Sequence, residues 1–243
     1  VIQVRSDDLL VRGMIDAMDA AQLATTLEKN VGLLAQALGI DPKSLPFWGP
    51  AVVLVAKDRE HYRLIQELAF GQAPAPDEIA MCHCVGPKVF VILQGDINPA
   101  VLIPAAAREL AHGLLHRHIS PVRLPAWANE GLAEWAAGQL RPEPADLVRR
   151  REIVQAAMRS GVPIAPVFDQ GYGSPPWENG NMPAAAIGRL AIELMLAERV
   201  QGFREWVRQV KHGTPWPEAL GTAFGTPPRT FVDAVWRHYQ TND

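Results

Sequence analysis

The order of strand-like and helix-like segments constrains the fold of this chain more than any other feature. Short runs of alternating or β-branched apolar residues lie early, at 1–15, 51–56, 79–85 and 88–94. Beyond them the chain takes on helical patterns, with apolar positions recurring every three or four residues. We therefore predict an α+β fold, with a small N-terminal β-sheet and its helices followed by an all-helical C-terminal part.

Capping and turn residues predict where the elements begin and end. A turn at Asp7-Asp8 separates two short strands, and Gly39 ends a helix that starts near residue 16. Asp58 can cap a helix running to about residue 70, and Gly86-Pro87 suits a hairpin turn. Further helices are expected at 99–118, 126–138, about 144–160, 183–200, 203–212, 215–223 and 228–240. The Gly- and Pro-rich segment 161–182 is expected to be an irregular loop, functional or disordered.

Composition excludes several classes of function. The chain has 243 residues, 48% of them hydrophobic, which is enough for a sizeable core. We predict an α+β subdomain over 1–140 and a helical subdomain over 141–243. A net charge of −3 gives no electrostatic case for a nucleic-acid partner, and the run 149–151 (Arg-Arg-Arg) is interpreted as the solvated face of a helix. No stretch reaches the roughly 18 apolar residues of a membrane span.

The first residue bears on the compartment. The chain begins at Val1 rather than at a methionine, so we expect that an upstream segment was removed or left out. A signal peptide or a membrane anchor would fit there, and the protein would then be exported or membrane-associated. The compartment stays open at this point.

Cys82 and Cys84, the only two cysteines, flank His83. Cysteines this close are poorly placed to bridge each other. Cys-His-Cys also lacks the second pair of ligands that a structural zinc site needs. The alternation along 79–85 favours a strand in which both thiols are small core residues.

The expected helix 99–118 carries a concentration of ionisable groups. Arg108, Glu109, His112 and His116 fall within an arc of about 100° around this helix. The buried faces are expected to carry Leu110, Leu114 and Leu115. Polar groups gathered on one face of an apolar helix are either solvated or arranged around a site.

A second motif lies on the next expected helix, after a loop that contains Pro121 and Pro125. It reads Trp-Ala-Asn-Glu-Gly-Leu-Ala-Glu over 127–134. Together with Arg-Glu-Leu-Ala-His at 108–112, it resembles the gluzincin zinc metallopeptidases, which include thermolysin-like enzymes and small peptidase-MA-like bacterial proteins. Their pattern is His-Glu-x-x-His, a proline-containing loop and a Trp-x-x-Glu-Gly-x-Ala-Glu helix.

The resemblance implies a role for each matching residue. His112 and Glu130 take the positions of zinc ligands, and Glu109 takes that of the general base acting on metal-bound water. Glu134 matches a carboxylate that orients the first zinc-binding histidine. The family also has a residue that stabilises the oxyanion, and Tyr172 is a candidate for that role. The favoured interpretation of Tyr172 is a loop aromatic without a catalytic role.

The first zinc ligand is the point of departure from the family, because Arg108 stands in its place. A guanidinium is a permanent cation without a lone pair, so it cannot bind zinc. We hypothesise that Arg108 supplies the missing positive charge by pairing with Glu130, Glu134 or both. A metal shifted to His112 and His116, with Glu109 or Glu130 as third ligand, is less favoured than a solvated polar helix end at His116.

Three functions follow from these residues. The favoured one is a pseudopeptidase with lost or weakened zinc binding, which binds a peptide or protein or serves as a scaffold subunit. The alternative is an active zinc-dependent peptidase with unusual coordination, using Glu109 as general base and His112 and Glu130 as ligands. A third is a purely structural domain whose former cleft is filled.

Overall fold

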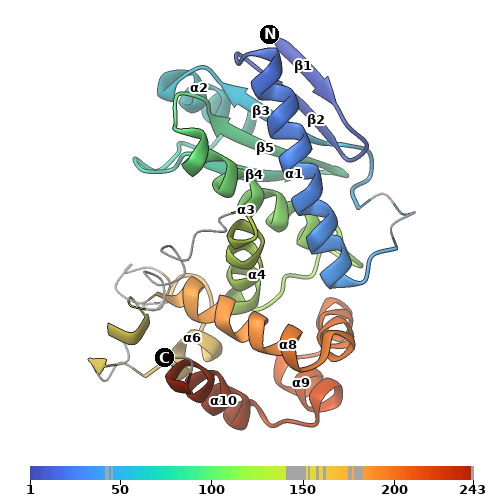
Figure 1. Cartoon of the computed structure of the whole chain (residues 1–243), viewed down its shortest axis with the longest axis vertical. Coiled ribbons are helices and arrows are strands. Elements are labelled where there is room, and N and C mark those ends of the chain that lie inside the picture. Colours follow the sequence, from blue (N-terminus) through green and yellow to red (C-terminus); the bar gives the residue numbers. More distant parts are fainter. Residues whose placement is uncertain are drawn as a thin grey trace. The chain divides into compact units, whose positions relative to one another are not determined.

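The computed structural model describes residues 1–41, 44, 46–140, 152, 154–156, 159–160, 163–174, 177 and 183–241. The chain divides into two compact units, Val1–His118 and Ile119–Asp243 (Figure 1). The first holds a mixed five-stranded sheet with helices, and the described part of the second is helical. The predicted α+β class is confirmed. The subdomain boundary that we expect at residue 140 lies inside the second unit and stays a prediction.

The sheet of the first unit forms where the sequence predicts strands. Its strands are β1 Ile2–Arg5, β2 Leu9–Gly13, β3 Ala51–Ala56, β4 Ala80–Val85 and β5 Lys88–Gln94, in the order β1-β2-β3-β5-β4. The pairs β1–β2 and β4–β5 are antiparallel hairpins, whereas β2–β3 and β3–β5 are parallel. β4 is therefore an edge strand, which becomes important for the site.

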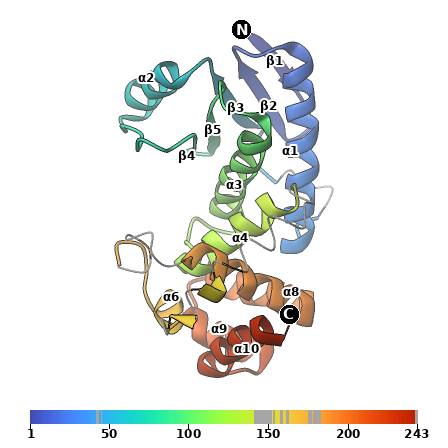
Figure 2. The ribbon, with the colours of Figure 1, turned by 60° about the vertical axis from the view of Figure 1, so that its left-hand side comes forward.

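Helices cover both faces of this sheet (Figure 2). On one face lie α1 (Ala17–Leu38) and α3 (Pro99–Arg117), which contact each other, and on the other lies α2 (Arg59–Phe70). The predicted caps are confirmed: Gly39 ends α1 in the left-handed conformation at φ 74°, and Asp58 accepts a hydrogen bond from the His61 N–H at 2.9 Å.

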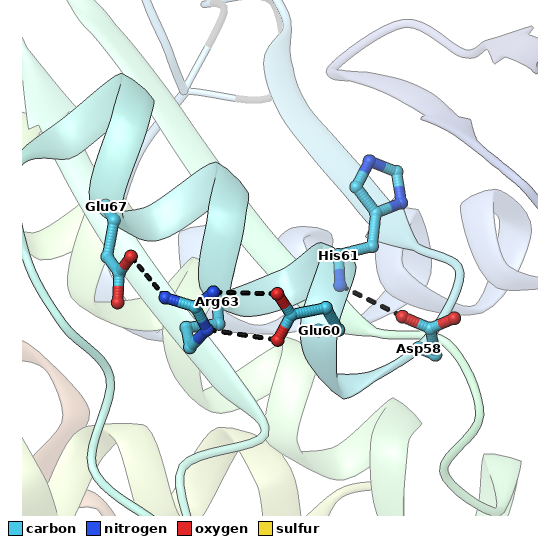
Figure 3. Close-up of polar contacts among 5 residues, drawn as sticks. All are labelled: Asp58, Glu60, His61, Arg63 and Glu67. Carbon is cyan, nitrogen blue, oxygen red and sulfur yellow. Dashed lines mark hydrogen bonds and ion pairs between the residues drawn. The ribbon is translucent and has the colours of Figure 1, made fainter.

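The outer side of α2 is held by ion pairs (Figure 3). Arg63 lies between Glu60 and Glu67, at 2.7 Å from the first carboxylate and 2.5 Å from the second. These contacts have the three- and four-residue spacing that brings side chains together on a helix surface. Because the three side chains are partly or fully exposed, the pairs add little to stability.

The inner side of α2 carries a chain of polar contacts. The buried Tyr62 hydroxyl donates to Glu78 at 2.8 Å and accepts from the Gln66 amide at 3.0 Å. The Gln66 side-chain oxygen lies 2.5 Å from Nε2 of His83. The His83 ring stacks on Phe70, with centroids 3.8 Å apart. His83 is thus tied to the α2 side of the sheet.

The second unit is built from helices α4 (Ala126–Gly138), α6 (Ala165–Asp169), α8 (Ala184–Lys211), α9 (Trp216–Phe224) and α10 (Pro228–Thr241). The two helices expected at 183–200 and 203–212 form one element with a kink at Arg199, whose φ of −162° and ψ of 95° are not helical. The short helix α6 falls within the expected loop 161–182. The helix expected at 144–160 and the run 149–151 lie largely or wholly outside the described residues.

Trp127 is the centre of the core of the second unit. It is fully buried, and its ring contacts four aromatic rings, those of Phe168, Trp206, Trp216 and Phe231. Leu132 on the same helix is also fully buried. Both are therefore packing residues of this helix.

Two glycines allow α4 and α8 to approach closely. A Cβ added at Gly131 would lie 2.4 Å from the carbonyl carbon of Gly188. A Cβ added at Gly188 would lie 2.1 Å from the backbone oxygen of Trp127. Backbone atoms cannot move aside as a flexible side chain can, so both positions require glycine.

We therefore predict that Gly131→Ala and Gly188→Ala each destabilise the protein by about 1–3 kcal/mol or more, because overpacking forces the helix backbones apart. Chemical denaturation measures the change. Gly221→Ala is the matched control, since nothing lies within 4 Å of its added Cβ on α9. That variant should gain about 0.5–1 kcal/mol from helix propensity. Equal effects at the three positions would contradict the close packing of α4 on α8.

A second prediction concerns pH. Burial lowers the pKa of His83 below its ordinary value of 6.5, so folding favours the neutral ring. The unfolded chain then binds more protons, and stability falls as pH drops below about 6.5. The His83→Gln variant should lack this loss. Burial and the nearby Glu28 raise the pKa of Asp8 to about 6, so protonation of Asp8 stabilises the fold as pH drops. This effect is the same in wild type and in His83→Gln, so it cancels in the comparison.

The measurement is therefore the difference in unfolding free energy between wild type and His83→Gln at pH 8 and at pH 5. The wild type should lose part of its advantage over the variant at pH 5. A difference that stays constant or grows in favour of the wild type would show that His83 is not held neutral.

Candidate functional site

Helix α3 carries the first motif. It begins after Asn98, whose side chain accepts from the Ala100 N–H at 2.9 Å, and Pro99 occupies its first turn. Arg108, His112 and His116, spaced four residues apart, are each partly exposed. The leucines expected to be buried are buried, namely Leu110, Leu114 and Leu115. The helix thus presents one polar stripe beside an apolar packing surface.

Glu109 does not share the exposure of that stripe. Only 8% of it is exposed, and its Oε2 accepts a hydrogen bond from the Cys82 N–H at 2.9 Å. The hydrogen bond from the Gln94 N–H to the Ile79 carbonyl shows which residues of β4 direct their N–H and C=O groups toward β5 and which direct them away. By that alternation the Cys82 N–H points away from β5, toward the free edge of the sheet. The Glu109 carboxylate therefore caps an amide of the edge strand.

Arg108 is close to the same carboxylate. Its Nη1 lies 4.0 Å from Oε1 of Glu109, and about a third of its side chain is exposed. At this separation the pair is a loose one, without the short charge-assisted geometry of a tight Arg–carboxylate contact. Arg108 therefore places a permanent positive charge beside the buried Glu109 carboxylate.

Helix α4 carries the second motif in the other unit. Oε1 of Glu130 accepts a hydrogen bond from the Tyr172 hydroxyl at 2.6 Å. That hydroxyl accepts in turn from the Asn129 side-chain amide at 2.8 Å, and the Tyr172 ring lies 5.9 Å from that of Trp177. Tyr172 thus contacts the second motif directly. The sequence pointed to this residue but not to its contact with Glu130.

The predicted site residues fall into two sets. Arg108, Glu109, His112 and His116 lie on α3 of the first unit, and Glu130, Glu134 and Tyr172 belong to the second unit. The pairing of Arg108 with Glu130 or Glu134 stays a prediction. Within the described ranges no group of three or more His, Cys, Asp or Glu residues is arranged to hold a metal ion, and zinc binding stays untested.

The expectation for the two cysteines is wrong in part. Cys82 is partly buried, but Cys84 is exposed rather than a core residue. The reason is that β4 is an edge strand, and its end near the hairpin turn is exposed from Cys84 to Val85. Alternation along a strand predicts which residues share a face, but it does not predict how far a helix covers that face.

Comparison with known proteins adds no assignment, since neither a family model nor a curated protein matches the chain. Among the residues that the structure describes, no helix combines the length and apolar character needed to cross a membrane.

Glu109 offers a test of its structural role. Glu109→Ala leaves the Cys82 N–H without its acceptor, which should destabilise the protein by about 1–3 kcal/mol. Glu109→Gln keeps an acceptor oxygen and should cost clearly less. Glu60→Ala, on the exposed side of α2, is the control and should be nearly as stable as wild type. Denaturant unfolding of the three variants decides the point, and an Ala variant as stable as the Gln variant would refute the capping role.

Proposed function

We propose that the protein is a catalytically inactive relative of the gluzincin metallopeptidases, a pseudopeptidase that binds a peptide or protein or serves as a scaffold subunit. The observation that carries the proposal is the placement of Glu109. This residue holds the general-base position, yet it is buried, bonded to the Cys82 amide and adjacent to the Arg108 cation. A general base needs an oxygen within reach of a reacting water, whereas this carboxylate is used in packing α3 against β4.

The set of ligands supports the same proposal. A catalytic zinc ion is held by three protein ligands and keeps one position for water. With Arg108 in the first position, only His112 and Glu130 match the remaining two. Glu130 also receives the hydroxyl of Tyr172, so one of its oxygens has a hydrogen-bond partner inside its own unit. Two ligands, one of them already engaged, favour weak zinc binding or none.

Binding of a partner would use what the motif helix still presents. Arg108, His112 and His116 leave a partly exposed stripe with a permanent cation at one end. The edge amide of Cys82, by contrast, is occupied by Glu109. An extended substrate that adds to a sheet edge uses the edge N–H and C=O groups for its main-chain hydrogen bonds. Occupation of this amide by Glu109 therefore favours recognition without the substrate alignment of a peptidase.

Zinc content tests the proposal. Wild-type protein should carry no stoichiometric zinc by elemental analysis and should show no chelator-sensitive peptide hydrolysis. Arg108→His restores a third ligand and should take up zinc, and adding His112→Ala should abolish that uptake. Stoichiometric zinc with chelator-sensitive hydrolysis in the wild type would overturn the proposal. Failure of Arg108→His to bind zinc would count against the family relationship itself.

A further inference from the structure

Cys82 and Cys84 present their thiols on the same face of the sheet. They lie two residues apart on β4, opposite Val91 and Val89 of β5, and side chains at that spacing point the same way. The face is the one covered by α3, because a Cβ added at Gly113 would lie 3.3 Å from the sulfur of Cys82. Neither cysteine forms a disulfide.

The histidine between them belongs to another environment. His83 points to the opposite face, where its ring stacks on Phe70 and its Nε2 lies 2.5 Å from the Gln66 side-chain oxygen. The sequence Cys-His-Cys therefore does not act as a set of three ligands. What the fold presents is a pair of sulfurs.

The spacing suits a metal ion better than a disulfide. Residues two apart on a strand have Cα atoms about 6.6 Å apart, at the upper end of the disulfide range, and their parallel side chains keep the Cβ atoms beyond the preferred distance of about 4 Å. Two metal–sulfur bonds of about 2.3 Å join sulfurs that are about 3.8 Å apart at a tetrahedral angle and about 4.6 Å apart when linear. Cys84 is the largest influence that raises the pKa of Cys82, as expected of two thiols side by side on one face of a strand.

We propose that Cys82 and Cys84 form a two-coordinate binding site for Cu(I). Thiolates are soft ligands and favour soft Cu(I), whereas a structural zinc ion takes four ligands. No larger group of metal-binding side chains surrounds the pair in the part of the chain that is described. This proposal does not depend on whether the motif on α3 and α4 binds zinc, because it uses neither His112 nor Glu130.

The surroundings of the pair give the ion access and set how its binding depends on pH. Cys84 is exposed, so a Cu(I) carrier can reach it first, and Cys82 is partly buried behind it. The neighbouring Cys84 and burial raise the pKa of the Cys82 thiol well above its ordinary value. The charge of Glu109 raises it further, and the Arg117 cation acts in the opposite direction. Binding must therefore release protons, and the affinity for Cu(I) should rise with pH.

The test is an anaerobic titration of the reduced full-length chain with Cu(I) against a colorimetric Cu(I) chelator. The wild type should retain one equivalent, and X-ray absorption should show two sulfur ligands. Cys84→Ser, at an exposed position, should fold normally and weaken Cu(I) binding by at least about 100-fold, more than the loss of a supporting contact would. Cys82→Ser should do the same, with folding checked by circular dichroism.

His83→Gln is the matched control and should keep the wild-type affinity, because His83 lies on the opposite face. No retention of Cu(I) by the wild type would overturn the proposal. So would equal retention by wild type and Cys84→Ser, which would assign the metal to other side chains. A strong loss in His83→Gln, with its fold intact, would replace the sulfur pair by a site that includes the ring.

Discussion

The hydrogen bond between the Cys82 N–H and the Glu109 carboxylate links the two features on which the rest of the first unit depends. One is an edge strand that would otherwise expose an amide, and the other is a helix with an acidic residue on its buried side. A buried carboxylate is costly unless its oxygens are paired. In this position the amide and the neighbouring Arg108 offset that cost. The same contact makes Glu109 part of the packing between α3 and β4.

This arrangement also bears on the proposal that Arg108 stands where a zinc peptidase carries its first metal ligand. In a zinc peptidase the metal would supply the positive charge near the glutamate of the motif helix. Here Arg108 brings a cation from the same helix, next to Glu109 in sequence and 4.0 Å away in space. A fixed cation can keep the electrostatic balance of such a helix while abolishing its capacity to bind metal.

Local signals in the sequence predict most of the elements, because their causes are local. Asp16 and Gly39 bracket α1, Asp58 begins α2, and Gly86 opens the hairpin turn. The contacts of the site are different, since Glu109 and Cys82 are 27 positions apart and Tyr172 and Glu130 are 42 positions apart. Neither pairing follows from periodicity or from capping rules, because both depend on tertiary packing. The exposure of Cys84 was missed for the same reason.

The contact between Gly131 and Gly188 limits how this protein can vary over time. A methyl group at either glycine would meet backbone atoms of the facing helix. Homologous chains with this helix packing should therefore keep glycine at both positions, whatever else in their sequences has changed.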